Sequence, residues 1–142
     1  MKNIILLISL ATTIISCSQN DEDDPIEETI YGTWKLIETY NGSGANNSQW
    51  KTIDDGYIYT FKKDNTFSSN RFNECSEGTF EINDSNLILK FNCIEFNTGI
   101  EPSPGVFIEN YAFGENYLFL TPTYLNCDEG CSNKFEKIKL NN

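Results

Sequence analysis

The sequence contains no histidine, and its one arginine is Arg71. Without histidine the chain lacks the usual general base and the commonest transition-metal ligand, and it cannot form a Ser-His or Cys-His nucleophile pair. Ten Lys and Arg residues stand against 21 Asp and Glu, for a formal net charge of −11. So acidic a surface repels phosphate backbones, and we expect no nucleic-acid partner. We therefore expect a protein that is not an enzyme and has no cofactor.

Long apolar runs are also missing, except for one close to the N-terminus. Residues 4–15 are almost wholly apolar or small, and they follow Lys2. A membrane-spanning helix needs about 20 apolar residues, so this run is typical of a secretory signal peptide, which we place at residues 1–16. Its end, "IISC", resembles the lipobox of bacterial lipoproteins, whose final cysteine is acylated on sulfur and becomes the new N-terminus. This resemblance makes Cys17 the lipidation site. The alternative is an ordinary export signal that happens to contain this cysteine.

The acidic segment after Cys17 has two interpretations. Residues 17–29 are polar and rich in Asp and Glu, which is typical of a solvated tether. Acidic runs directly after the lipidated cysteine also resemble the surface-export signal of lipoproteins in the Bacteroidetes, and Ser18 is what outer-membrane sorting usually shows. These resemblances imply a chain anchored by acyl chains in the outer membrane, facing the cell exterior, with the periplasmic face as the alternative.

Aromatic residues are abundant, and the rest of the chain alternates short apolar runs with turn residues. Ten Phe, seven Tyr and two Trp favour strands and a packed core. We expect one monomeric domain over residues 30–140: an all-β, eight-stranded antiparallel up-and-down barrel. A two-sheet sandwich is the alternative. The expected strands are 31–40, 56–63, 66–72, 77–83, 86–92, 106–113, 117–121 and 134–140, and residues 41–52 have the composition of a loop.

Alternation along these segments predicts which side chains face the barrel interior. On the first strand, Trp34, Leu36 and Tyr40 share one face. The side chains that we expect to point inward are Trp34, Leu36, Tyr57, Tyr59, Phe61, Phe80, Ile82, Leu87, Leu89 and Phe91.

Four cysteines remain after Cys17, and in an oxidising compartment they are expected to form disulfides. The hairpin that turns at residues 84–85 pairs Ile82 with Leu87. Continuing this register brings Cys75 and Cys93 side by side with a mismatch of one residue, which requires a bulge. A hairpin centred on "CDEGC" would join Cys127 to Cys131 and pair the apolar residues Leu120 with Ile138 and Leu118 with Leu140. A four-cysteine zinc site is the alternative, but the spacing lacks two short cysteine pairs. We therefore expect no metal.

The first strand begins with Gly32-Thr33-Trp34, which looks like the G-x-W of the lipocalins. Together with "YTFKKDNTF", "CSEGTFEI", "LILKFNC" and "CDEGCSNKFEKI", it resembles the lipocalin-like lipoproteins of Bacteroidetes. The resemblance implies a barrel with a ligand-capable interior and a tryptophan closing one end. In lipocalins that tryptophan packs under an arginine of the last strand, whereas here the last strand offers Lys134, Lys137 and Lys139.

Two functions follow from such a barrel. In the first, a lipid-anchored protein binds a small hydrophobic or amphipathic molecule, with ligand-binding candidates Trp34, Tyr57, Tyr59, Phe61, Leu89 and Phe91. In the second, side chains fill the barrel, and exposed loops such as 41–55 or 97–105 bind a protein or a glycan. Trp50 is then either an exposed anchor for the partner or a lid over the barrel mouth.

Overall fold

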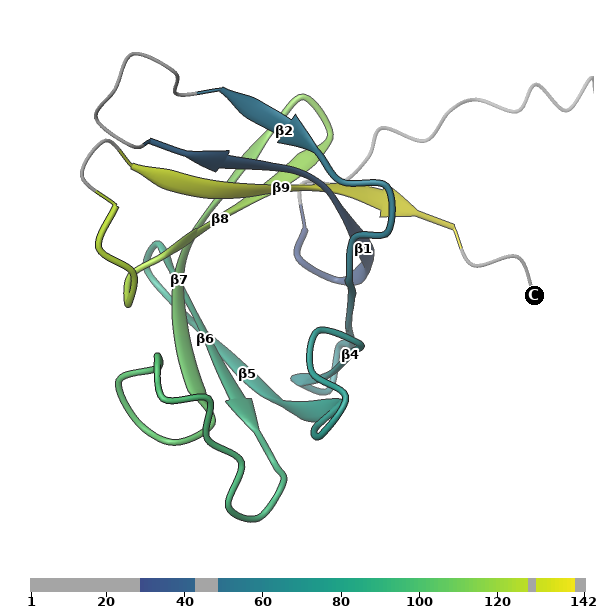
Figure 1. Cartoon of the computed structure of the whole chain (residues 1–142). Helices are drawn as coiled ribbons and strands as arrows, with labels where there is room; N and C mark the ends of the chain where they lie inside the picture. Colours follow the sequence, from purple (N-terminus) through teal and green to yellow (C-terminus); the bar gives the residue numbers. More distant parts are fainter. Residues whose placement is uncertain (1–28, 43–48, 128–129, 140–142) are drawn as a thin grey trace, which may run out of the picture.

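The protein is a closed antiparallel β-barrel (Figure 1). The structure is a computed structural model that describes residues 29–42, 49–127 and 130–139, so the predicted signal peptide, Cys17 and most of the predicted tether lie outside the described residues. Apart from the short β2, eight strands follow one another round the barrel in chain order, and β1 pairs with β9 to close it, which confirms the predicted fold. Within the described residues, no helix has the length and apolar character to span a membrane. The strands are β1 (Gly32–Asn41), β2 (Trp50–Thr52), β3 (Ile58–Phe61), β4 (Thr66–Ser69), β5 (Glu77–Asn83), β6 (Asn86–Phe91), β7 (Val106–Gly114), β8 (Tyr117–Pro122) and β9 (Cys131–Ile138).

Strands β2 and β3 form one interrupted strand along the same edge of β1. The first half of β1 pairs with β3, and its second half pairs with β2. Between them residues 53–57 leave the ladder, and Gly56 is required there because a Cβ atom would lie 1.8 Å from the carbonyl oxygen of Leu36. The prediction of a loop over 41–52 was therefore wrong at 50–52. These three residues are held by pairing with β1, which their own composition does not reveal.

A bulge in β1 reverses the faces of that strand. Leu36 pairs with Phe135, but the next paired residue, Glu38, pairs with Lys134, so one residue of β1 is extra. Before the bulge, even-numbered side chains point inward. After it they point outward, so Tyr40 lies on the outer wall and not on the face of Trp34 as simple alternation predicts.

The barrel core contains most of the side chains predicted to point inward, together with Phe67, Phe107, Leu118, Leu120 and Phe135 from the other strands. Tyr57 is half-buried and packs against this core. The prediction for Ile82 was wrong, because its side chain is 44% exposed. Ile82 pairs with the buried Leu87 as expected. However, it lies at the end of β5 next to the turn at Asp84, beyond the side chains that pack in the core.

Trp34 closes one end of the barrel, as the lipocalin resemblance implies. Its indole N–H donates a hydrogen bond to the carbonyl oxygen of Ile30 at 2.8 Å. Lys137 takes the place that the resemblance assigns to an arginine, with its ammonium nitrogen 5.3 Å from the centre of the Trp34 ring. Gly32 allows this approach, because its φ is 126° and a Cβ atom there would lie 2.8 Å from Cε of Lys137.

Both predicted disulfides, Cys75–Cys93 and Cys127–Cys131, are confirmed. The register predicted for the last hairpin was wrong, because Leu118 pairs with Phe135 and Leu120 with Asn133. The last strand begins at Cys131, so the second bridge closes a short turn within the connection from β8 to β9 and does not continue the ladder.

Candidate functional site at the open end of the barrel

The two ends of the barrel are built differently. At the end closed by Trp34, tight turns join β3 to β4, β5 to β6 and β7 to β8. The other end, called the open end below, carries the longer connections, which follow β1, β4, β6 and β8. Both disulfides lie there, and Cys75–Cys93 ties the β4–β5 connection to the β6–β7 connection.

The barrel interior is filled by its own side chains. Tyr59 is completely buried, and its ring centre lies 5.4 Å from that of Phe61 and 5.9 Å from those of Phe67 and Phe135. Three surface hollows lined by described residues lie at the barrel ends or on the outer wall. The structure thus brings the predicted ligand-binding residues together, but as a core packed on itself. They are Trp34, Tyr57, Tyr59, Phe61, Leu89 and Phe91.

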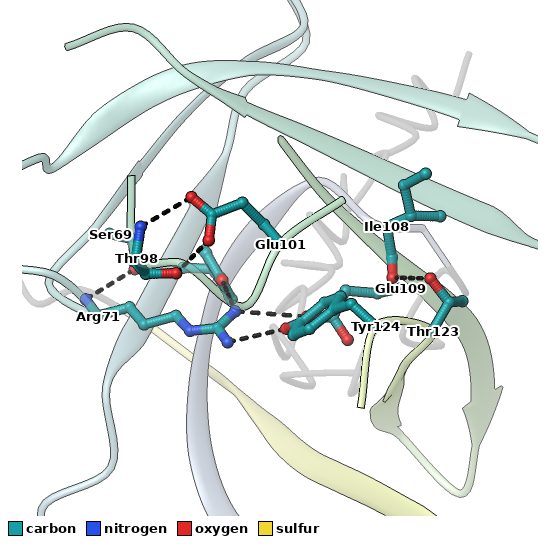
Figure 2. Close-up of polar contacts among 9 residues, drawn as sticks. Ser69, Arg71, Thr98, Glu101, Ile108, Glu109, Thr123 and Tyr124 are labelled. Carbon is teal, nitrogen blue, oxygen red and sulfur yellow. Dashed lines mark hydrogen bonds and ion pairs between the residues drawn. The ribbon is translucent and has the colours of Figure 1, made fainter. Parts of the chain in front are cut away.

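A buried polar cluster lies where the core meets the open end (Figure 2). Arg71, just after β4, donates hydrogen bonds to the hydroxyl of Tyr59 at 3.1 Å and to that of Tyr124 at 2.9 Å. Its Nη1 atom also lies 3.3 Å from Oε1 of Glu109, which accepts a further hydrogen bond from Tyr124 at 2.7 Å. The guanidinium group stands over the rings of Tyr57, Phe72 and Phe107.

The electrostatics of this cluster are dominated by burial. The Glu109 side chain is 1% exposed, and its second carboxylate oxygen, Oε2, has no hydrogen-bond partner. Burial raises the pKa of Glu109, although Arg71 and Tyr124 oppose the shift. Burial also raises the pKa of Tyr59 and of Tyr124, so both phenols stay protonated and can donate hydrogen bonds.

This cluster acts as a latch across the open end. Arg71 comes from the β4–β5 connection and Tyr124 from the β8–β9 connection, and both are held by a carboxylate of β7. The backbone N–H of Arg71 donates to Ser69 Oγ, and Thr123 Oγ1 donates to the carbonyl oxygen of Ile108, which fixes both connections locally (Figure 2).

This cluster was not predicted from the sequence, although one signal pointed to it. On β7, Phe107 and Glu109 are the two buried alternate residues, so the aromatic pattern of "VFIENYAF" places a carboxylate on the inward face. A buried carboxylate needs a counter-ion, and Arg71 is the one arginine of the chain. The separation of 38 residues between them hid the pair.

Trp50 lies on the outer wall of the barrel and is not a lid. Its ring packs against Tyr40 at 5.6 Å and against Phe119 at 6.0 Å between centres. Phe119 lies between Leu118 and Leu120 on β8, which are both buried in the core, so Phe119 faces away from the core. Trp50 remains 41% exposed.

Other apolar side chains are exposed on the connections of the open end. Ile94 and Ile100 of the β6–β7 connection are 94% and 48% exposed, and Leu125 of the β8–β9 connection is 43% exposed. Of the large apolar side chains that the described residues expose, every one except Ile82 lies at or next to this end. Within residues 29–42, 49–127 and 130–139, no group of three or more Cys, Asp or Glu side chains is placed to hold a metal ion.

Neither a protein-family model nor a curated protein matches the chain. Several solved structures are similar to it in fold, and two of them have TM-scores above 0.5. A lipocalin-like protein from Bacteroides uniformis has a TM-score of 0.51 at 15% identity, covering 76% of this chain and 97% of that one. An uncharacterized protein from Bacteroides eggerthii has a TM-score of 0.51 at 16% identity, covering 76% of this chain and 98% of the other. With its closed eight-stranded barrel and its tryptophan-capped end, this chain therefore has the lipocalin-like fold.

Proposed function

We propose that this chain is an exported, lipid-anchored lipocalin-like protein whose filled barrel presents its open end to a partner protein. One observation carries the proposal: ring-to-ring contacts occupy the interior, whereas Ile94, Ile100, Leu125 and Trp50 are each exposed at or beside one end. Exposed apolar groups rimmed by polar residues mark interaction sites. Branched aliphatic side chains favour a protein partner over a glycan, which needs flat aromatic platforms and hydrogen-bonding groups. The proposal includes no catalytic role, cofactor or metal.

Site-specific photo-crosslinking tests this proposal. We expect p-benzoylphenylalanine at Ile94 to give a crosslinked band of one defined mass in cells that make the protein naturally. The matched control is the same replacement at Ile82, which is similarly apolar and exposed but lies at the opposite end, and it should give no such band. Equal crosslinking from both positions, or none from either, contradicts the proposal.

The membrane anchor is the second part of the proposal. Its support is the "IISC" sequence at Cys17 and the acidic tether behind it. Three acyl chains would hold the protein firmly, because each buried methylene contributes about 0.8 kcal/mol. We expect metabolic labelling with an alkyne fatty acid to mark the chain in the outer-membrane fraction and Cys17→Ala to remove the label. An undiminished label in the variant would contradict the anchor.

A second candidate function is the binding of a small amphipathic molecule within the barrel. One observation favours it: Oε2 of Glu109 is buried without a partner, so it can accept a hydrogen bond from a polar group that enters the open end. However, Oε2 is fully buried, the other carboxylate oxygen is bonded to Arg71, and the ring of Phe72 stacks on that of the nearby Phe107, so a ligand would have to move packed side chains to reach it. The packing therefore favours the first function.

A further inference from the structure

A hollow at the open end lies between the two connections that the Cys75–Cys93 disulfide joins. Its volume is about 460 Å³, which is enough for one long side chain. Its wall contains both apolar and acidic groups. The lining residues include Phe72, Cys93, Ile94 and Phe96, which are apolar, and Glu74 and Glu95, which are acidic.

The apolar wall of this hollow is fixed before any partner binds. The rings of Phe72 and Phe96 lie 5.1 Å apart, and each packs against Phe91, at 5.3 and 5.2 Å. The disulfide holds the two walls together at a Cα–Cα distance of 5.7 Å. A preformed site loses little conformational entropy on binding, so it needs few contacts to be effective.

Glu101 fixes the rest of the β6–β7 connection. Its carboxylate accepts hydrogen bonds from the backbone N–H and the hydroxyl of Thr98 (Figure 2). It also accepts hydrogen bonds from the backbone N–H groups of Ile100 and Gly105. Slight burial opposes ionisation, but these hydrogen bonds lower the pKa of Glu101 to about 2. Glu101 is thus a permanent structural anion, and it is already satisfied within the chain.

Glu74 and Glu95 differ from Glu101 in the surroundings of their carboxylates. Both are exposed, and among the described residues neither carboxylate forms a hydrogen bond or an ion pair. Glu95 has a φ of 60°, a left-handed conformation that is costly for a residue with a side chain. Beside them Ile94 is 94% exposed, so the hollow has an apolar lip as well as two free charges.

The charge of the two connections beside the hollow is one-sided. The connections 70–76 and 92–105 contain three acidic residues, which are Glu74, Glu95 and Glu101. Their one cation is Arg71, which is buried against Glu109. The turns of the closed end, in contrast, contain Lys62 and Lys63 as well as acids. Charge complementarity therefore favours a cationic partner at the open end.

From this geometry we infer that the hollow binds a basic segment of the partner protein, which makes this inference dependent on the proposed function. The aliphatic stem of one lysine or arginine lies against Phe72 and Phe96, and its charged head lies between Glu74 and Glu95. Long basic side chains commonly bury the stem on apolar surface and keep the head near water. Ile94 contacts an apolar neighbour of that residue in the partner segment.

The test is a titration of the 15N-labelled full chain, in detergent micelles, with the peptide acetyl-GLKGLKG-amide, followed by backbone amide shifts. We expect the shifts to concentrate on residues 72–75 and 93–98. The variant E74Q/E95Q should bind about 3- to 10-fold more weakly, as expected for two solvent-exposed charge pairs. The affinity should also fall with added salt, and a peptide with glutamine at both lysines should bind less tightly.

The control variant E81Q/D84N removes two exposed acids at the closed end, so it should bind the peptide like the unaltered chain. Equal loss in the control, shifts spread over the whole acidic surface, or no binding would overturn the inference. If Ile94 still crosslinks to a partner in any of these cases, the proposed function stands and only the cationic chemistry falls. If the crosslink is also absent, both fall.

Discussion

Replacing Arg71 with methionine is expected to lower the free energy of unfolding by about 3–5 kcal/mol at pH 8, because it leaves a buried carboxylate without its counter-ion. The carboxylate is that of Glu109, which is 1% exposed and bonds to Arg71 and Tyr124 through the same oxygen. Urea denaturation followed by tryptophan fluorescence measures the loss. A change below about 1 kcal/mol would mean that Arg71 faces solvent and does not latch the open end.

The pH dependence of the free energy of unfolding tests whether the Glu109 carboxylate causes the loss of stability in R71M. Burial raises its folded-state pKa above the unfolded value of about 4.3, so the folded state binds the proton more tightly. The resulting stabilisation is fully present below the unfolded pKa and is lost as pH rises through the folded pKa. Removing Arg71 raises that pKa further, so the penalty of R71M should shrink as pH falls from 8 toward 4.5. In the matched control, R71M/E109L, both charges are gone, and stability should return to near that of the parent chain.

Removing the Cys75–Cys93 disulfide is the second change with a large expected effect. The bridge joins residues 18 apart in sequence, and the loop-closure model gives a loss of about 3 kcal/mol for C75A/C93A. Because Cys75 is also buried in the core, the lost sulfur atom adds to the penalty. Urea denaturation under oxidising conditions, compared with the parent chain under the same conditions, measures the difference.

The second disulfide provides the control. Cys127 and Cys131 are only 4 residues apart, so the same model gives a smaller loss of about 2 kcal/mol for C127A/C131A. The amide signals of residues 93–98 should broaden in C75A/C93A and stay sharp in the control. Equal losses from both variants would show that the long bridge does not hold the two connections together.

The barrel and its longer disulfide could be predicted because they depend largely on local alternation, whereas Cys127–Cys131 was predicted correctly from a wrong register. Phe80 and Leu89 lie on strands where every second residue is apolar, and the β5–β6 turn fixes their pairing. The register from that hairpin brought Cys75 and Cys93 to within one residue of each other, and a bulge had to be assumed to pair them. The same method failed on β1, because a single extra residue between Leu36 and Glu38 reverses the faces and no sequence pattern marks a bulge of this kind.

The open end was harder to predict, because its contacts join residues far apart in the sequence. Trp50 was recognised as important, but its place on the outer wall depends on a three-residue strand that exists only by pairing with β1. Arg71 and Glu109 meet because β4 ends and β7 begins at the same end of the barrel. Such a meeting depends on barrel closure, which alternation within one strand cannot specify.

The central claim, that the barrel is filled by its own side chains, is tested most directly by native mass spectrometry. The full chain, purified from membranes in detergent, is weighed folded and again after unfolding. If the interior is filled, both masses equal that of the chain with its covalently attached groups, and nothing is released. A small amphipathic molecule retained in an amount equal to the chain and freed only by unfolding would contradict the claim.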